Sequence, residues 1–251
     1  MSAERKEIVL TAASVSDRGL VRAENQDHHY EDLGRSVFCV ADGMGGGQGG
    51  AKASEIVCAH VAGVLEGTSD YASRVDGVVK CLQSANLAIQ RFAQKSGYDQ
   101  MATTVVATVF DVDSARVSCV HVGDSRLYRW RDGKLDQLTV DHTVSEELSR
   151  RADLAMYSAQ LRASSNPYSH VLTRAIGIGE TVESERSEHE VRPGDRYLLC
   201  SDGIYDMLGE DGLTNVFNLG GSPRASVARL QALTVREGAE DNYTAIVVKV
   251  D

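Results

Sequence analysis

The chain has few of the features that usually divide a protein or carry it across a membrane. It contains 251 residues and only three prolines, and no Ser/Gly-rich or Pro-rich tract separates two patterned halves, so we expect a single domain over residues 1–251. No apolar run approaches the roughly 20 residues that a membrane-spanning helix needs. The first seven residues lack the apolar segment of a signal peptide, so a cytoplasmic protein is expected.

Paired cysteines and an excess of basic residues are also missing. The five cysteines are odd in number and widely spaced, with no Cys-x-x-Cys pair, which indicates small core residues rather than a zinc site or a catalytic thiol. Lysine and arginine total 26 against 36 acidic residues, a formal net charge of −10. This balance argues against a nucleic-acid partner. It would also repel an anionic substrate unless metal ions or local arginines intervened.

Apolar periodicity predicts strands, two long helices, more strands, two short helices and a last strand. The predicted strands cover residues 7–15, 27–32, 36–41, 103–110, 115–122, 127–131, 183–191, 196–200 and 243–250. A glycine-rich turn at residues 43–50 leads into the first predicted helix. The predicted helices cover residues 53–65, 71–94, 211–218 and 223–237. Short links between strands indicate antiparallel pairing, and strict β-α alternation is missing. We therefore expect one sheet packed on another, with helices outside.

Five short motifs, each built around an aspartate, are spread along the chain. They are Asn25-Gln26-Asp27, Asp42-Gly43-Met44-Gly45-Gly46, Gly123-Asp124-Ser125-Arg126, Ser201-Asp202-Gly203 and Asp241-Asn242. Taken singly, each also fits a turn or a helix cap. Three of the aspartates follow predicted buried strands, and carboxylates gathered at strand ends would repel one another unless cations joined them. The set predicts a metal site. The glycine-rich turn lacks the Gly-Lys-Ser/Thr ending of a phosphate-binding P-loop.

In order and spacing the motifs resemble the metal-dependent, type 2C-like (PPM) family of serine/threonine protein phosphatases, in its bacterial branch. The matching segments are residues 22–27, 40–46, 122–126, 138–142, 172–177, 199–203 and 241–248. The resemblance implies an α+β fold, a four-layer α-β-β-α sandwich of two antiparallel sheets flanked by helix pairs. It also implies a site in a cleft at one edge of that sandwich.

The resemblance also implies roles for the aspartates. Asp42 would bridge two divalent ions, with the carbonyl of Gly43 as a further ligand, and Asp202 and Asp241 would complete the shell of the first ion. Asp27 would support the second ion. All-oxygen ligands select Mn²⁺ or Mg²⁺ rather than zinc. Two such ions about 3.5–4 Å apart would lower the pKa of a bridging water, which would attack phosphorus in line.

Further roles follow from the same resemblance. Arg22 would clamp the substrate phosphate, and Asp124 would hold a third ion, for which Ser165 is a further candidate ligand. Residues 141–169 match the family's flap. Met44 stands where many eukaryotic members have a histidine proposed as the general acid, so the proton donor is left open. Asn166 stands where bacterial relatives commonly have a histidine.

The expected function is hydrolysis of phosphoserine and phosphothreonine in proteins by a metal-activated water, with Arg22 and Asp42 as catalytic residues. The expected partners are phosphoproteins and a cognate kinase of the bacterial Hanks type, whose action the enzyme would reverse, and a monomer is expected. Two alternatives stay open. One is a pseudophosphatase that binds phosphoproteins without turnover, and the other is a phosphatase dedicated to a regulator of sigma factors.

Overall fold

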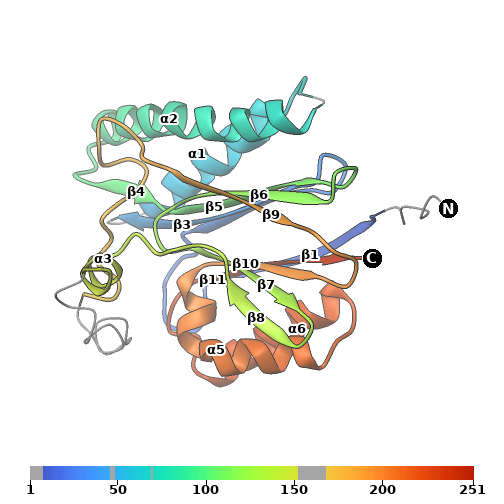
Figure 1. Cartoon of the computed structure of the whole chain (residues 1–251). Helices are drawn as coiled ribbons and strands as arrows, with labels where there is room; N and C mark the ends of the chain where they lie inside the picture. The colour runs from blue at the N-terminus through green and yellow to red at the C-terminus, as the bar shows by residue number, and fades with distance from the viewer. Residues whose placement is uncertain (1–7, 46–48, 69, 152–167) are drawn as a thin grey trace.

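A computed structural model of the chain describes residues 8–45, 49–68, 70–151 and 168–251 (Figure 1). The strands are β1 (Leu10–Asp17), β2 (Asp27–Asp32), β3 (Val37–Gly45), β4 (Met101–Thr103), β5 (Val105–Asp111), β6 (Arg116–Val122), β7 (Arg126–Arg131), β8 (Lys134–Gln137), β9 (Glu185–Glu190), β10 (Arg196–Cys200) and β11 (Tyr243–Val250). The helices are α1 (Gly49–Val64), α2 (Tyr71–Ser96), α3 (Val144–Ser149), α5 (Asp202–Asn218) and α6 (Pro223–Arg236). No helix in these ranges combines the length and apolarity that crossing a membrane requires.

Two antiparallel sheets lie face to face between two helix pairs. One sheet has the strand order β1-β11-β10-β7-β8, and the other has the order β2-β3-β5-β6-β9, with β4 paired to β3. Figure 1 shows α1 and α2 over the second sheet and α5 and α6 under the first. The predicted α+β fold, a four-layer α-β-β-α sandwich, is confirmed. Of the predicted flap at residues 141–169, the structure describes residues 141–151, which include α3, and residues 168–169.

Alternation along the strands explains why the chain forms these layers. In β3, Val37 and Cys39 pack toward α1 and α2, whereas Phe38 and Val40 pack toward the other sheet. Successive side chains of a strand point to opposite faces, so a strand that is apolar at every position can fill two cores at once. The continuous apolar runs of the sequence are therefore the central strands of a sandwich that is covered on both sides.

Two elements near the predicted site differ from the sequence prediction. β3 continues to Gly45, because β4 pairs with its end, with Gly43 opposite Thr103, so the predicted glycine-rich turn begins later than residue 43. α5 begins at Asp202 rather than near residue 211, since Ser201 is in the extended conformation of an N-cap. The prediction found only the part beyond Gly209, where a backbone φ of 61° kinks the helix.

The core between the two sheets contains a chain of aromatic rings. Phe110 of β5 lies edge-on to Phe38 at a centroid distance of 5.8 Å and to Tyr197 of β10 at 5.2 Å. All three side chains are fully buried. Edge-to-face pairs of this kind contribute about 0.5–1.5 kcal/mol each beyond the apolar area that they bury. Phe110 thus joins the two sheets.

We expect Phe110→Ala to lower the free energy of unfolding by about 3–5 kcal/mol, because it opens a cavity between the sheets. Equilibrium unfolding in urea measures this loss. Leu20→Ala is the matched control: Leu20 is 65% exposed, and its truncation should change stability by less than about 0.5 kcal/mol. A loss below about 1 kcal/mol for Phe110→Ala would contradict the described core.

Candidate active site

A cleft of about 610 Å³ gathers most of the predicted site residues at one edge of the sandwich. Its walls include Arg22, Asp42, Gly43, Asp124, Asp202 and Asp241. These residues come from distant parts of the chain, and the ends of strands from both sheets carry several of them to the same place. Asp27 lies beside this set rather than on the wall, directly opposite Asp42 in the β2–β3 pairing. Ser165, the predicted further ligand, falls outside the described residues.

Asp27 is a buried carboxyl group with one satisfied oxygen. Its side chain is 3% exposed, and its Oδ2 accepts a hydrogen bond of 2.7 Å from the hydroxyl of Ser201. Its Oδ1 is buried without a hydrogen-bond partner among the described residues. Burial raises the pKa of Asp27 to about 7. Because buried polar atoms nearly always have partners, the free oxygen beside Asp42 indicates a place for a cation.

Asp42, Asp202 and Asp124 also have raised pKa values, because burial and neighbouring negative charges oppose their ionisation. Burial, followed by the charges of Asp27 and Asp202, raises the pKa of Asp42 well above its ordinary value. Burial and the charge of Asp241 raise the pKa of Asp202, and burial and the charge of Asp202 raise the pKa of Asp124 well above its usual range. Burial and mutual repulsion both oppose the ionised form of these side chains, and divalent cations among them would favour it.

Arg22 lies on the exposed side of the cleft. Its Nη2 donates a hydrogen bond of 2.5 Å to Oδ2 of Asp241, and its side chain is 57% exposed. The hydrogen bond to Asp241 raises the pKa of Arg22, with the charges of Asp202 and Asp42 adding to the effect. The guanidinium is therefore both a counter-ion to the aspartates and accessible to an anion from solvent.

Asn242 holds the segment that carries Arg22 in place. Its Nδ2 donates hydrogen bonds of 2.9 Å to the backbone carbonyls of Arg18 and Glu24. Its Oδ1 accepts one of 2.8 Å from the backbone N–H of Gln26. The sequence placed Asn242 in a motif without giving it a role. These bonds show that it ties residues 18–26 to the start of β11, beside the aspartates.

Two stacked histidines pack near the cleft. The rings of His121 and His142 are 4.6 Å apart, and the side chains of both lie within 4.8 Å of a carboxylate oxygen of Glu185. Nδ1 of His142 accepts a hydrogen bond from the backbone N–H of Gly123, so the proton of the neutral ring is on Nε2, which faces Glu185 at 3.4 Å. The guanidinium of Arg174 is 3.4 Å from the same Nε2. A protonated nitrogen beside a cation argues against a metal site here.

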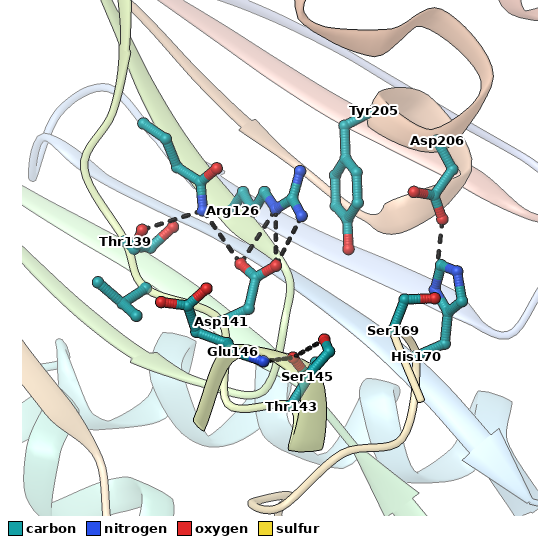
Figure 2. A pocket seen from close by; sticks show the side chains of 12 residues that line it. Arg126, Thr139, Asp141, Thr143, Ser145, Glu146, Ser169, His170, Tyr205 and Asp206 are labelled. Atoms are coloured by element: carbon teal, nitrogen blue, oxygen red, sulfur yellow. Dashed lines mark hydrogen bonds and ion pairs between the residues drawn. The ribbon is translucent and has the colours of Figure 1, made fainter. Parts of the chain in front are cut away.

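A smaller pocket of about 300 Å³ adjoins the cleft, and Figure 2 shows the side chains that line it. In it Arg126 donates hydrogen bonds of 2.6–3.1 Å to Asp141 and stacks on the ring of Tyr205. His170 lines both cavities and is 47% exposed. Its imidazole comes within 4.8 Å of carboxylate oxygens of Asp124 and Asp202. No sequence pattern indicated this contact, because His170 lies between two motifs as one of seven scattered histidines.

The chain matches known proteins over most of its length. Residues 20–233 match the sequence profile of protein phosphatase 2C. The serine/threonine protein phosphatase PstP of Mycobacterium tuberculosis is 36% identical over 248 residues, which cover 98% of this chain and 46% of the relative, so the chain spans about half the length of that protein. The serine/threonine phosphatase stp of Listeria monocytogenes is 30% identical over 251 residues, with 94% of each chain covered.

The fold is similarly shared with solved structures. The crystal structure of the catalytic domain of the serine/threonine protein phosphatase PstP in complex with two manganese ions is similar to this structure with a TM-score of 0.81. The two sequences are 34% identical, and the similarity covers 97% of this chain and 99% of the other.

The histidine pair gives an expected pH dependence of stability. Burial, with smaller contributions from His121 and Arg174, lowers the pKa of His142 to about 4. In the unfolded chain a histidine has a pKa of about 6.5. The stability that neutral His142 contributes is therefore fully present above pH 6.5 and is lost as pH falls toward 4. His142→Asn keeps an acceptor near the position of Nδ1 but does not titrate.

Between pH 7 and pH 4.5 we expect the metal-free wild type to lose about 1–3 kcal/mol more unfolding free energy than His142→Asn. Urea unfolding of both proteins at several pH values gives this difference directly. The aspartates titrate in both proteins, so their effects cancel in the comparison. Equal pH dependence in the two proteins would show that His142 is not buried in its neutral form.

Proposed function

Because the chain belongs to the protein phosphatase 2C family, we propose that it is a metal-dependent phosphatase that removes phosphate from phosphoserine and phosphothreonine in proteins. The family predicted from the motifs, in its bacterial branch, is confirmed by these matches. The observation that carries the proposal is the meeting of Asp42, Asp124, Asp202, Asp241 and Arg22 at one cleft. Carboxylates suit divalent ions, and an arginine beside them suits a phosphate.

The proposed metal ligands fit hard divalent cations. Asp42 would be shared by two ions, with the carbonyl of Gly43 as a further ligand. Asp202 and Asp241 would complete the shell of the first ion, and Asp27 would support the second. The free Oδ1 of Asp27 and the mutual repulsion of the carboxylates support this. Bound ions of this kind polarise phosphoryl oxygens and lower the pKa of coordinated water. The described oxygen ligands suit Mn²⁺ and Mg²⁺ alike.

Glycine at position 43 lets the ends of two elements approach each other closely beside these ligands. A Cβ atom at Gly43 would lie 2.1 Å from the backbone oxygen of Gly50 at the start of α1. Any side chain there would push α1 away from β3 and displace Asp42, which is the preceding residue of the strand. The close approach supports the assignment of the Gly43 backbone to the metal site.

Arg22 would bind the substrate phosphate. A guanidinium can donate two parallel hydrogen bonds to phosphate oxygens and offset the charge that they carry in the transition state. In the described structure Arg22 is paired with Asp241. A cation held by Asp241 would weaken that pair and leave Arg22 for the phosphate. Met44 has no proton to give, so the leaving serine or threonine oxygen takes its proton from another group or from water.

The wider expectations are proposals that rest on the family. We propose a cytoplasmic monomer that reverses a bacterial Hanks-type kinase, with phosphoproteins as substrates and a third ion at Asp124. A single domain over residues 1–251, with a flap at about residues 141–169, stays a prediction. The second ligand predicted for the third ion, Ser165, lies outside the described residues.

Asp202→Asn tests the proposal most simply. We expect Mn²⁺-stimulated hydrolysis of a phosphothreonine peptide to fall at least about 100-fold, because the change removes a charged metal ligand and leaves an amide in its place. Phosphate release measures activity, and calorimetric titration measures Mn²⁺ binding. Asp211→Asn is the matched control, since Asp211 is an exposed residue of the same helix and should retain full activity.

Full activity of Asp202→Asn would contradict the metal-dependent mechanism. A wild type that binds Mn²⁺ and the phosphopeptide but releases no phosphate would instead be a pseudophosphatase. A dedicated target such as a regulator of sigma factors would appear as hydrolysis of that phosphoprotein with little hydrolysis of the peptide.

A further inference from the structure

We propose that His170 is a metal ligand, and that its imidazole joins Asp124 and Asp202 in a cation site that takes a transition-metal ion such as Mn²⁺ in preference to Mg²⁺. The inference rests on the metal use proposed above. It goes beyond that proposal because it adds a nitrogen ligand to a site proposed with oxygen ligands alone. His170 also had no role in the sequence analysis.

The spacing of the three side chains fits a shared ion. One ligand atom from each of Asp124, His170 and Asp202 lies within 4.8 Å of the others. Two ligands on opposite sides of one small divalent ion lie roughly 4.2 Å apart. His170 is half-exposed, so its side chain has room to move toward an ion between the two carboxylates.

Asp124 supplies a second, independent observation. Its side chain is only 6% exposed and lines the cleft. Within the described ranges its carboxylate accepts no hydrogen bond from the side chain of another residue, whereas the neighbouring Ser125 is bonded to Thr104. A carboxylate with so little exposure usually has a partner from another residue. An ion between Asp124 and His170 would give it one.

Asp206 orients the imidazole for this role. Figure 2 shows the ring of His170 facing Asp206, with Nδ1 3.5 Å from Oδ2 of the carboxylate. A proton on Nδ1 leaves the lone pair of Nε2 for an ion. Metal-bound histidines usually donate their other ring N–H to a carboxylate or a carbonyl in this way. Asp206 lies one turn beyond Asp202 on α5, so one helix carries both a ligand and the positioning residue of another.

The nitrogen ligand determines which ions the site accepts. Mg²⁺ takes oxygen ligands and keeps its waters, whereas imidazole suits first-row transition metals. Among the described residues that line the cleft, His170 is the only histidine. The remaining proposed ligands all offer oxygen. A nitrogen signal on a bound metal would therefore identify this one site.

Pulsed electron paramagnetic resonance of the full chain loaded with Mn²⁺ tests the inference directly. We expect the wild type to show coupling between Mn²⁺ and the nitrogen of an imidazole, and His170→Ala to lack it. His60→Asn, a change on α1 outside the cleft, should keep the coupling. Excess Mg²⁺ should displace Mn²⁺ from the all-oxygen sites and leave the nitrogen-coupled Mn²⁺ bound.

Asp206→Asn separates positioning from ligation. We expect this variant to bind the nitrogen-coupled Mn²⁺ about 10–100-fold more weakly, with the coupling restored at saturating Mn²⁺, because the ring loses its orienting partner and keeps its ligand atom. A wild type without nitrogen coupling, or coupling that persists in His170→Ala, would overturn the inference.

Phosphate release from a phosphothreonine peptide, measured on the same wild-type sample, tells the two proposals apart. Hydrolysis without nitrogen coupling overturns the role of His170 and leaves the phosphatase intact. Coupling without hydrolysis upholds the ligand and overturns the phosphatase.

Discussion

Repulsion among buried carboxylates is the constraint on which the rest of the site depends. β2 and β3 place Asp27 directly opposite Asp42, and the N-terminus of α5 brings Asp202 beside them. Separate aspartates in water would move apart. Here the pairing of β2 with the buried strand β3 and the start of α5 position the three carboxylates, so the fold holds the charges together at the cost of some stability.

The protein offsets only part of this repulsion by itself. The hydroxyl of Ser201 satisfies one oxygen of Asp27, and Arg22 pairs with Asp241. The second interaction is exposed to solvent, where ion pairs contribute about 1 kcal/mol or less. Burial, together with the remaining charges of Asp27 and Asp202, keeps the pKa of Asp42 well above its ordinary value. Divalent cations would offset the negative charge that remains on the aspartates. The affinity for metal and the lower stability of the metal-free site therefore have the same origin, the closely placed carboxylates.

The layers of the fold could be predicted from the sequence because apolar runs and their alternation are local signals. Residues 196–200 were predicted as a strand and form β10 with those bounds. Long-range pairing was not visible in the same way. β3 extends to Asp42, which pairs with Asp27 of β2, and then to Gly45, because β4, far along the chain, pairs with its last three residues. The start of α5 was missed because Ser-Asp-Gly after a strand is equally typical of a turn.

The motif residues of the site were predicted together because each stands in a recognisable pattern of neighbours. His170 was not, since a single histidine outside the motifs carries no signal until the fold brings it to Asp124. The same holds for the pairing of Arg22 with Asp241, which joins two ends of the chain. The sequence indicated which side chains would share one site, whereas their hydrogen-bond and ion-pair partners depend on tertiary contacts.

Unfolding free energies of the wild type and Asp42→Asn, with and without Mn²⁺, test the central claim most directly. If the carboxylates are held together against their repulsion, metal-free Asp42→Asn is more stable than the metal-free wild type. Mn²⁺ at a hundred times its dissociation constant then stabilises the wild type by about 2.7 kcal/mol and the variant much less. A metal-free variant less stable than the wild type, together with no stabilisation of the wild type by Mn²⁺, would contradict the account.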